Sequence, residues 1–80
     1  MNSAANNTAT QTINLEAAEA SIRRPVMGAD DASAHGRELR VLEAALLRQA
    51  DALFAVEPHL YQRRMTLAAE AGNAAAFLGA

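Results

Sequence analysis

The chain has 80 residues, a formal net charge of −2 and no cysteine, so it holds at most one small domain and forms neither a disulfide framework nor a thiolate metal site. The slight negative charge gives no long-range attraction to nucleic acid or to an anionic membrane. Hydrophobic residues make up 51% of the sequence but aromatic residues only 4%, and much of the hydrophobic share is alanine, which favours helix and buries little area. We therefore expect an all-α protein.

Residues 1–12 consist of uncharged polar residues and alanine, and Met1 is their one large apolar side chain. Such a segment cannot bury enough surface to offset the entropy lost on ordering, so we expect a disordered tail. It lacks the basic and apolar regions of a signal peptide, and the sequence has no apolar run of membrane-spanning length. We expect a cytoplasmic protein with no membrane contact, whose single small helical domain covers residues 13–80.

A short helix is expected from Leu15 to about Arg24. Asn14 is a good N-cap, Glu16 places an acidic side chain in the first turn, and Pro25 prevents continuation. The apolar side of this helix is too narrow for it to be stable alone. It consists of Leu15, Ala18 and Ile22.

The main helix is predicted from Arg37, after a linker in which Asp30, Asp31 or Ser33 can cap it. Large apolar residues recur there at alternating spacings of three and four, which places them on one stripe of a helix. Gln49 and Arg63 occupy the two turns of the stripe that lack an apolar residue. The interface that we predict from this leucine stripe is Leu39, Leu42, Leu46, Gln49, Leu53, Val56, Leu60 and Leu67.

Pro58 lies inside this pattern. A proline within a helix removes a hydrogen bond and crowds the carbonyl four residues earlier, so the helix either kinks at Pro58 or stops and restarts there. Because Val56, Leu60 and Leu67 keep the register set upstream, we favour one long, Pro-kinked helix. We expect Gly72 and Asn73 to end it.

A single helix with such a stripe needs a surface to pack on. That surface is the short first helix, a second copy of the chain or a different helical protein, which gives a helical hairpin or an oligomeric bundle. We therefore predict a self-association or protein-interaction module that acts through the leucine stripe. Gln49 is able to fix the register of the packed helices, although a polar residue is also tolerated at a loose interface.

The sequence contains no catalytic, cofactor-binding or metal-binding motif. His35 and His59 are far apart and have no third ligand at helical spacing, and Asp30 and Asp31 lack the further acidic ligands of a cation-binding loop. There is also no glycine-rich phosphate loop. We predict that the protein is not an enzyme and carries no cofactor.

A polar cluster after Pro58 suggests a second function. Two arginines beside an aromatic ring can contact phosphate and stack on a base, although in an acidic chain they are more often a solvated helix face. The segment around Gly72 partly resembles a helix-turn-helix, but Asn73 occupies a place that is usually apolar. A small DNA-binding regulator is therefore the alternative, with contacts from His59, Tyr61, Arg63 and Arg64.

Residues 13–29, INLEAAEASIRRPVMGA, together with LLRQADALFAVE and LAAEAGN within residues 46–73, resemble a group of small, uncharacterised helical proteins encoded in proteobacterial genomes and mobile elements. The resemblance covers residues 13–78. It implies an α-helical hairpin and carries no catalytic or binding motif. In that group a second long helix follows the turn, whereas this sequence stops at Ala80. Two interpretations follow: a truncated or nonfunctional remnant of a longer helical protein, or a chain whose missing half another molecule supplies.

Overall fold

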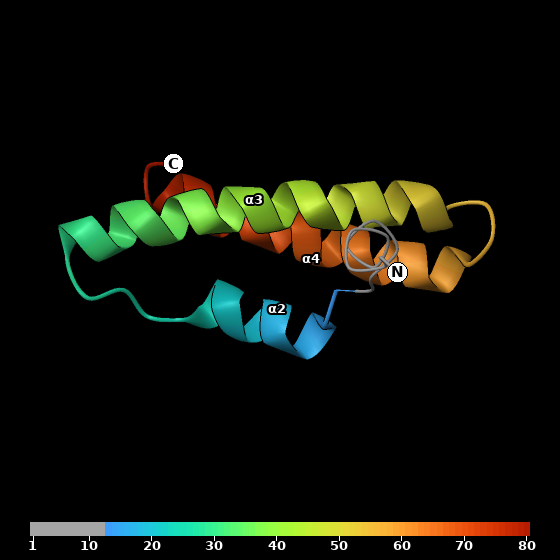
Figure 1. Ribbon diagram of the computed structural model, residues 1–80, viewed down its shortest axis with the longest axis horizontal. Helices are drawn as coiled ribbons and strands as arrows, with labels where there is room; N and C mark the ends of the chain where they lie inside the picture. The colour runs from blue at the N-terminus through green and yellow to red at the C-terminus, as the bar shows by residue number, and fades with distance from the viewer. Residues whose placement is uncertain (1–12) are drawn as a thin grey trace, which may run out of the picture.

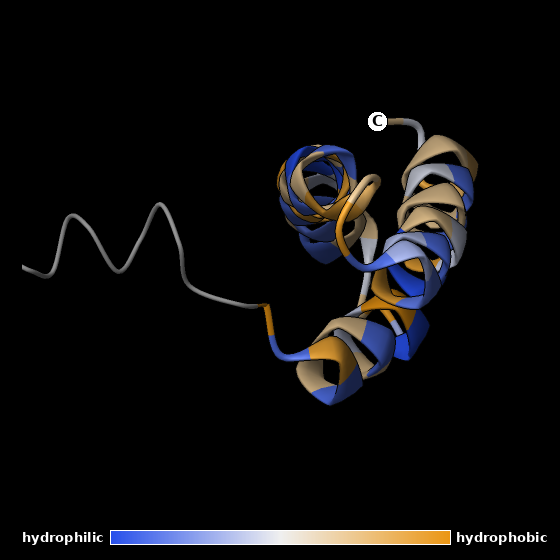
Figure 2. Ribbon diagram, turned by 90° about the vertical axis from the view of Figure 1, so that its right-hand side faces the viewer, coloured by the Kyte–Doolittle hydropathy of each residue, from blue (hydrophilic) through white to orange (hydrophobic). Residues whose placement is uncertain are grey.

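The computed structural model describes residues 13–80, and the expected tail, residues 1–12, lies outside the described residues. The described part contains three helices and no strand, which confirms the all-α prediction. The helices are α2 (Leu15–Arg23), α3 (Ala29–Leu53) and α4 (Pro58–Phe77). Helices α3 and α4 lie side by side and run in opposite directions, and α2 packs along one side of the pair (Figure 1). Figure 2 shows that the three helices form a triangle in cross-section.

Helix α2 starts and stops as the sequence predicts. The side chain of Asn14 accepts a hydrogen bond from the Ala17 backbone N–H at 3.1 Å, which satisfies one of the free donors of the first turn. The backbone becomes extended at Arg24, as expected for the residue before Pro25. A helix of nine residues is not stable in isolation, so α2 depends on packing against its neighbours, although Ala18 is its one fully buried residue.

Helix α3 begins at Ala29, eight residues before the expected start at Arg37. Gly28, with a φ of 113°, makes the turn into the helix. The Asp31 carboxylate then accepts from the Met27 backbone N–H at 2.8 Å and from the guanidinium of Arg24 at 3.0 Å. These hydrogen bonds, that of Arg24 first, hold the pKa of the Asp31 carboxyl below its ordinary value.

The predicted continuous, Pro-kinked helix is wrong. Helix α3 ends at Leu53, a turn follows, and Pro58 is the first residue of α4. Proline suits that position because the first residues of a helix have no partner for their N–H groups and proline fixes a helical φ. The turn is closed by two N–H groups, of Val56 at 3.2 Å and of Glu57 at 2.8 Å, which donate to the Leu53 carbonyl. The chain therefore reverses direction where the sequence pattern suggested a kink.

The expected stop at Gly72 and Asn73 is also wrong, because α4 continues to Phe77. Gly72 keeps helical geometry and faces the side chain of Glu43 on α3, whose carboxylate oxygen would lie 2.5 Å from a Cβ at this position. The left-handed glycine that follows the helix is Gly79, with a φ of 83°. Ala71 and Ala75, on either side of Gly72, are fully buried, so the packing of this part of α4 favours helix over the local preference of glycine to end one.

The core lies between α3 and α4 and is closed by α2. Leucines form its centre, and small residues line the places where the two long helices approach closely. The fully buried hydrophobic residues are Ala18, Leu39, Leu46, Ala50, Leu67, Ala68, Ala71 and Ala75. Partly buried residues of the α2 segment, Ile13, Leu15 and Ile22, pack against this centre together with Leu42.

Candidate interaction surface

The leucine stripe lies mostly inside the molecule. Leu39, Leu46 and Leu67 are fully buried. Leu42, Gln49, Leu53 and Leu60 are partly buried, and only Val56, in the turn, is exposed. The chain's own helices therefore cover most of the side chains that the sequence assigned to a partner. Association with another molecule stays a prediction, and its surface has to be sought elsewhere.

The turn before Pro58 shifts the register of the stripe. In the sequence, Arg63 seemed to occupy the polar position between Leu60 and Leu67. In the structure the buried face of α4 instead contains Arg64, which lies one turn from each leucine and is 3% exposed. Arg63 is exposed and pairs with Glu19 of α2 at 3.0 Å.

A buried polar pair joins the two long helices. The Arg64 Nε donates to the side-chain oxygen of Gln49 at 3.0 Å, and Nη1 donates to the Leu60 carbonyl at 3.2 Å. The same Gln49 oxygen accepts from the Ile13 backbone N–H at 3.3 Å, just before α2. Gln49 thus links all three segments. The sequence indicated a register role for Gln49 but gave no signal that its partner is an arginine fifteen positions away.

The residues proposed for nucleic-acid contact do not form one cationic surface. Arg64 is buried and Arg63 is paired with Glu19. His59 is exposed, with its Nε2 3.7 Å from a carboxylate oxygen of Glu57. Tyr61 packs edge-on against Phe54, with ring centroids 5.0 Å apart. The two arginines therefore have partners within the chain, and the view of them as a solvated face is correct only for Arg63.

The turn between α3 and α4 lies at the right-hand end of Figure 1, and several apolar residues in or near it are exposed. Leu47 is 41%, Phe54 61% and Val56 71% exposed. Phe54 directly follows α3 with helical dihedrals and is seven residues from Leu47, so the two side chains lie on one side of the end of α3. Tyr61 of α4 lies beside them through its ring contact with Phe54. We call these four residues, Leu47, Phe54, Val56 and Tyr61, the turn-end patch.

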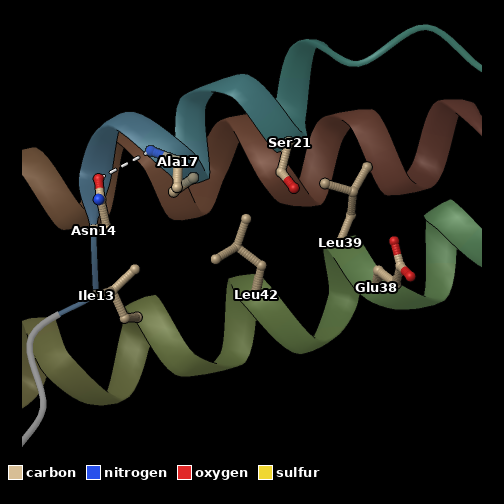
Figure 3. A pocket seen from close by; sticks show the side chains of 8 residues that line it. Ile13, Asn14, Ala17, Ser21, Glu38, Leu39 and Leu42 are labelled. Atoms are coloured by element: carbon tan, nitrogen blue, oxygen red, sulfur yellow. Dashed lines mark hydrogen bonds between the residues drawn. The ribbon is translucent and has the colours of Figure 1, made fainter.

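A groove of about 240 Å³ separates α2 from α3. Figure 3 shows Leu39 and Leu42 rising from α3 toward the small side chains of Ala17 and Ser21 on α2. Ile13 borders one end of the groove and Glu38 lies at its edge. Because small residues face leucines here, α2 is not closely packed against α3.

His35, considered from the sequence only as a metal ligand, is buried within α3. It is 2% exposed, and neither ring nitrogen has a hydrogen-bond partner. Its Nδ1 lies 3.5 Å from a carboxylate oxygen of Glu38. Within residues 13–80, no three side chains of the types that bind metals come together.

Comparison with known proteins adds no functional information. No family model, no curated protein and no solved structure matches the chain. None of the helices described between residues 13 and 80 is both long enough and apolar enough to cross a membrane. The surface itself is therefore the basis for a functional proposal.

Proposed function

We propose that the chain is a small helical module that self-associates through the turn-end patch. The observation that carries the proposal is the exposure of Phe54 and Val56 beside Leu47 and Tyr61, whereas Leu39, Leu46 and Leu67 are fully buried. Clustered aromatic and aliphatic side chains on a surface are typical of protein interaction sites. Compared with the leucine stripe, this patch is open to a partner without any rearrangement of the fold.

A second copy of the chain is the partner that fits best. Between Leu47 and Phe54, the exposed side of α3 carries one cation, Arg48, and one anion, Asp51. In a twofold pair with antiparallel α3 helices, Arg48 of each copy faces Asp51 of the other, and the two apolar patches meet. A partner with a large charge of one sign would match only half of this surface.

Sedimentation velocity over a range of concentrations tests the proposal. We expect the unmodified chain to associate as its concentration rises, and the double variant Leu47→Ser with Phe54→Ser to stay monomeric with unchanged helicity. Val41→Ser is the matched control, because Val41 is a 69% exposed apolar residue of α3 outside the patch. An unmodified chain that stays monomeric at every concentration would contradict the proposal, as would a double variant that associates like the control.

A further inference from the structure

We infer that the chain binds a small aliphatic carboxylate, whose head pairs with the buried Arg64 and whose apolar tail lies in the groove between α2 and α3. This inference goes beyond self-association and does not depend on the turn-end patch. It joins two features that the fold leaves without a role, a buried positive charge that has no counter-charge and an apolar groove that no side chain fills. The two features meet at Ile13.

The charge of Arg64 is not neutralised by the chain itself. The residue is 3% exposed, and within residues 13–80 no carboxylate lies at ion-pair distance from its guanidinium. Residues 1–12 contain no aspartate or glutamate, so they bring no acidic side chain to it either. Buried arginines are almost always paired, because removing a charge from water is costly unless an opposite charge compensates. An anion from outside the chain would supply that compensation.

The guanidinium also has hydrogen-bond donors that the fold does not use. Nε donates to the Gln49 side chain at 3.0 Å and Nη1 to the Leu60 carbonyl at 3.2 Å, and both acceptors are neutral. Nη2 makes no hydrogen bond with the described part of the chain. Guanidinium groups bind the paired oxygens of carboxylates and phosphates through charge-assisted hydrogen bonds. The remaining donors of Arg64 therefore favour an oxyanion.

The groove favours an oxyanion that carries a hydrocarbon tail. Its volume is about 240 Å³, and leucines of α3 face small residues of α2 across it (Figure 3). Leu39 and Leu42 form the α3 side, and Ala17 and Ser21 belong to the α2 side. An aliphatic chain in this space removes its methylene groups from water and covers the leucines, which is favourable. Because the groove extends over only a few residues of each helix, it suits a short or medium chain.

The two ends of the groove differ in charge, and this sets the direction of the ligand. Ile13 borders one end, and its backbone N–H donates at 3.3 Å to the same Gln49 oxygen that accepts from Arg64. Glu38, whose side chain is 73% exposed, lies at the opposite end in Figure 3. A carboxylate head is repelled by Glu38 and attracted by Arg64. The head therefore lies at the Ile13 end, and the tail extends along the groove away from it.

Isothermal titration calorimetry with octanoate tests the inference. We expect octanoate to bind saturably and octanol, which has an equally long chain and no charge, to bind roughly 10- to 100-fold more weakly, because it forms no hydrogen bond between two charged groups. Arg64→Leu is expected to lose octanoate binding. Arg63→Leu, at the exposed arginine next to it, is the matched control and is expected to keep it. Circular dichroism shows whether each variant is folded.

Ala17→Leu tests the tail separately from the head. The larger side chain fills the groove, whereas Arg64 and its hydrogen-bond partners stay unchanged. We expect this variant to remain helical and to bind octanoate at least about tenfold more weakly, because the tail loses the apolar surface that it would cover. Ala20→Leu, the same substitution at an exposed alanine of α2 outside the groove, is the control. This variant keeps the inference open to refutation even if Arg64→Leu does not fold.

Three results would overturn the inference. The first is an unmodified chain that does not bind octanoate at millimolar concentration. The second is binding that persists in Ala17→Leu or in a folded Arg64→Leu, because the ligand would then lie elsewhere. The third is inorganic phosphate that binds as tightly as octanoate, because the groove would then have no role. The proposed function is tested separately, since the double variant Leu47→Ser with Phe54→Ser is expected to bind octanoate like the unmodified chain.

Discussion

The buried contact between Gln49 and Arg64 predicts an unusual pattern of stabilities. The substitution Gln49→Leu removes the acceptor of the Arg64 Nε and of the Ile13 N–H while keeping a similar side-chain volume. The guanidinium stays buried and keeps one bond, to the Leu60 carbonyl. A hydrogen bond to a charged group contributes about 1.5–3 kcal/mol and a neutral one about 1 kcal/mol. We therefore expect a cost of roughly 3 kcal/mol.

That cost is large for a chain of this size. Small domains have about 0.05–0.15 kcal/mol of stability per residue, so the variant loses a major part of its total. We expect a fall in melting temperature of at least roughly 10 °C, because 1 kcal/mol shifts Tm by about 4–8 °C in domains of this length. Thermal and urea unfolding followed by far-ultraviolet circular dichroism measure it. Gln62→Leu, at an exposed glutamine of α4, is the matched control.

The decisive measurement is the double variant Gln49→Leu with Arg64→Leu. It replaces the buried charge together with its acceptor, and such replacements are often neutral or stabilising. We expect the second substitution to restore stability on the Gln49→Leu background, although Arg64→Leu alone destabilises the unmodified chain. If the two costs simply add, or if Gln49→Leu behaves like Gln62→Leu, the buried pair has no special role.

Three further substitutions test other parts of the fold. Leu46→Ala opens a cavity at a fully buried site and is expected to cost about 2–5 kcal/mol in urea unfolding, whereas Leu47→Ala, at the exposed patch, costs much less. His35→Leu removes two buried nitrogens without hydrogen bonds and is expected to raise Tm, and no change or a fall would show that the proximity of Nδ1 to the Glu38 carboxylate is favourable. Asp31→Asn tests the lowered pKa. The stabilising contribution of Asp31 is present above its unfolded pKa and is lost as pH falls through the lower folded value, so the variant shows less loss of stability in that acid range.

The sequence predicted the structure correctly where that structure depends on residues close together in the chain. The cap at Asn14 and the stop before Pro25 act within one turn of helix, and α2 was predicted almost to its last residue. The periodic leucines of α3 likewise identified residues that are buried. The start of α3 was missed because Gly36, which disfavours helix, lies within it, where a Cβ would be 2.8 Å from that of Ala80.

The structure at Pro58 could not be predicted from the residues next to it. A proline is compatible both with a kink and with the first position of a new helix, and the choice depends on what the two flanking segments pack against. The spacing of Val56 and Leu60 continues the period of α3 in the sequence, but Val56 lies exposed in the turn and the buried face of α4 has a different register, so the continuity did not indicate one helix. The reversal is favoured because it brings the leucines of α3 onto α4, which no property of the turn residues alone indicates.

The burial of Arg64, like the reversal at Pro58, depends on contacts between parts of the chain that are distant in the sequence. Nothing near it in the sequence distinguishes it from Arg63, and only the arrangement of α4 against α3 decides which of the two faces Gln49.

The alanine-rich composition explains why a partner is not needed to enclose the stripe. Ala68, Ala71 and Ala75 let α4 approach α3 closely, so a few leucines fill the space between them. Leu47, Phe54 and Val56 lie outside this close packing and stay exposed at the surface.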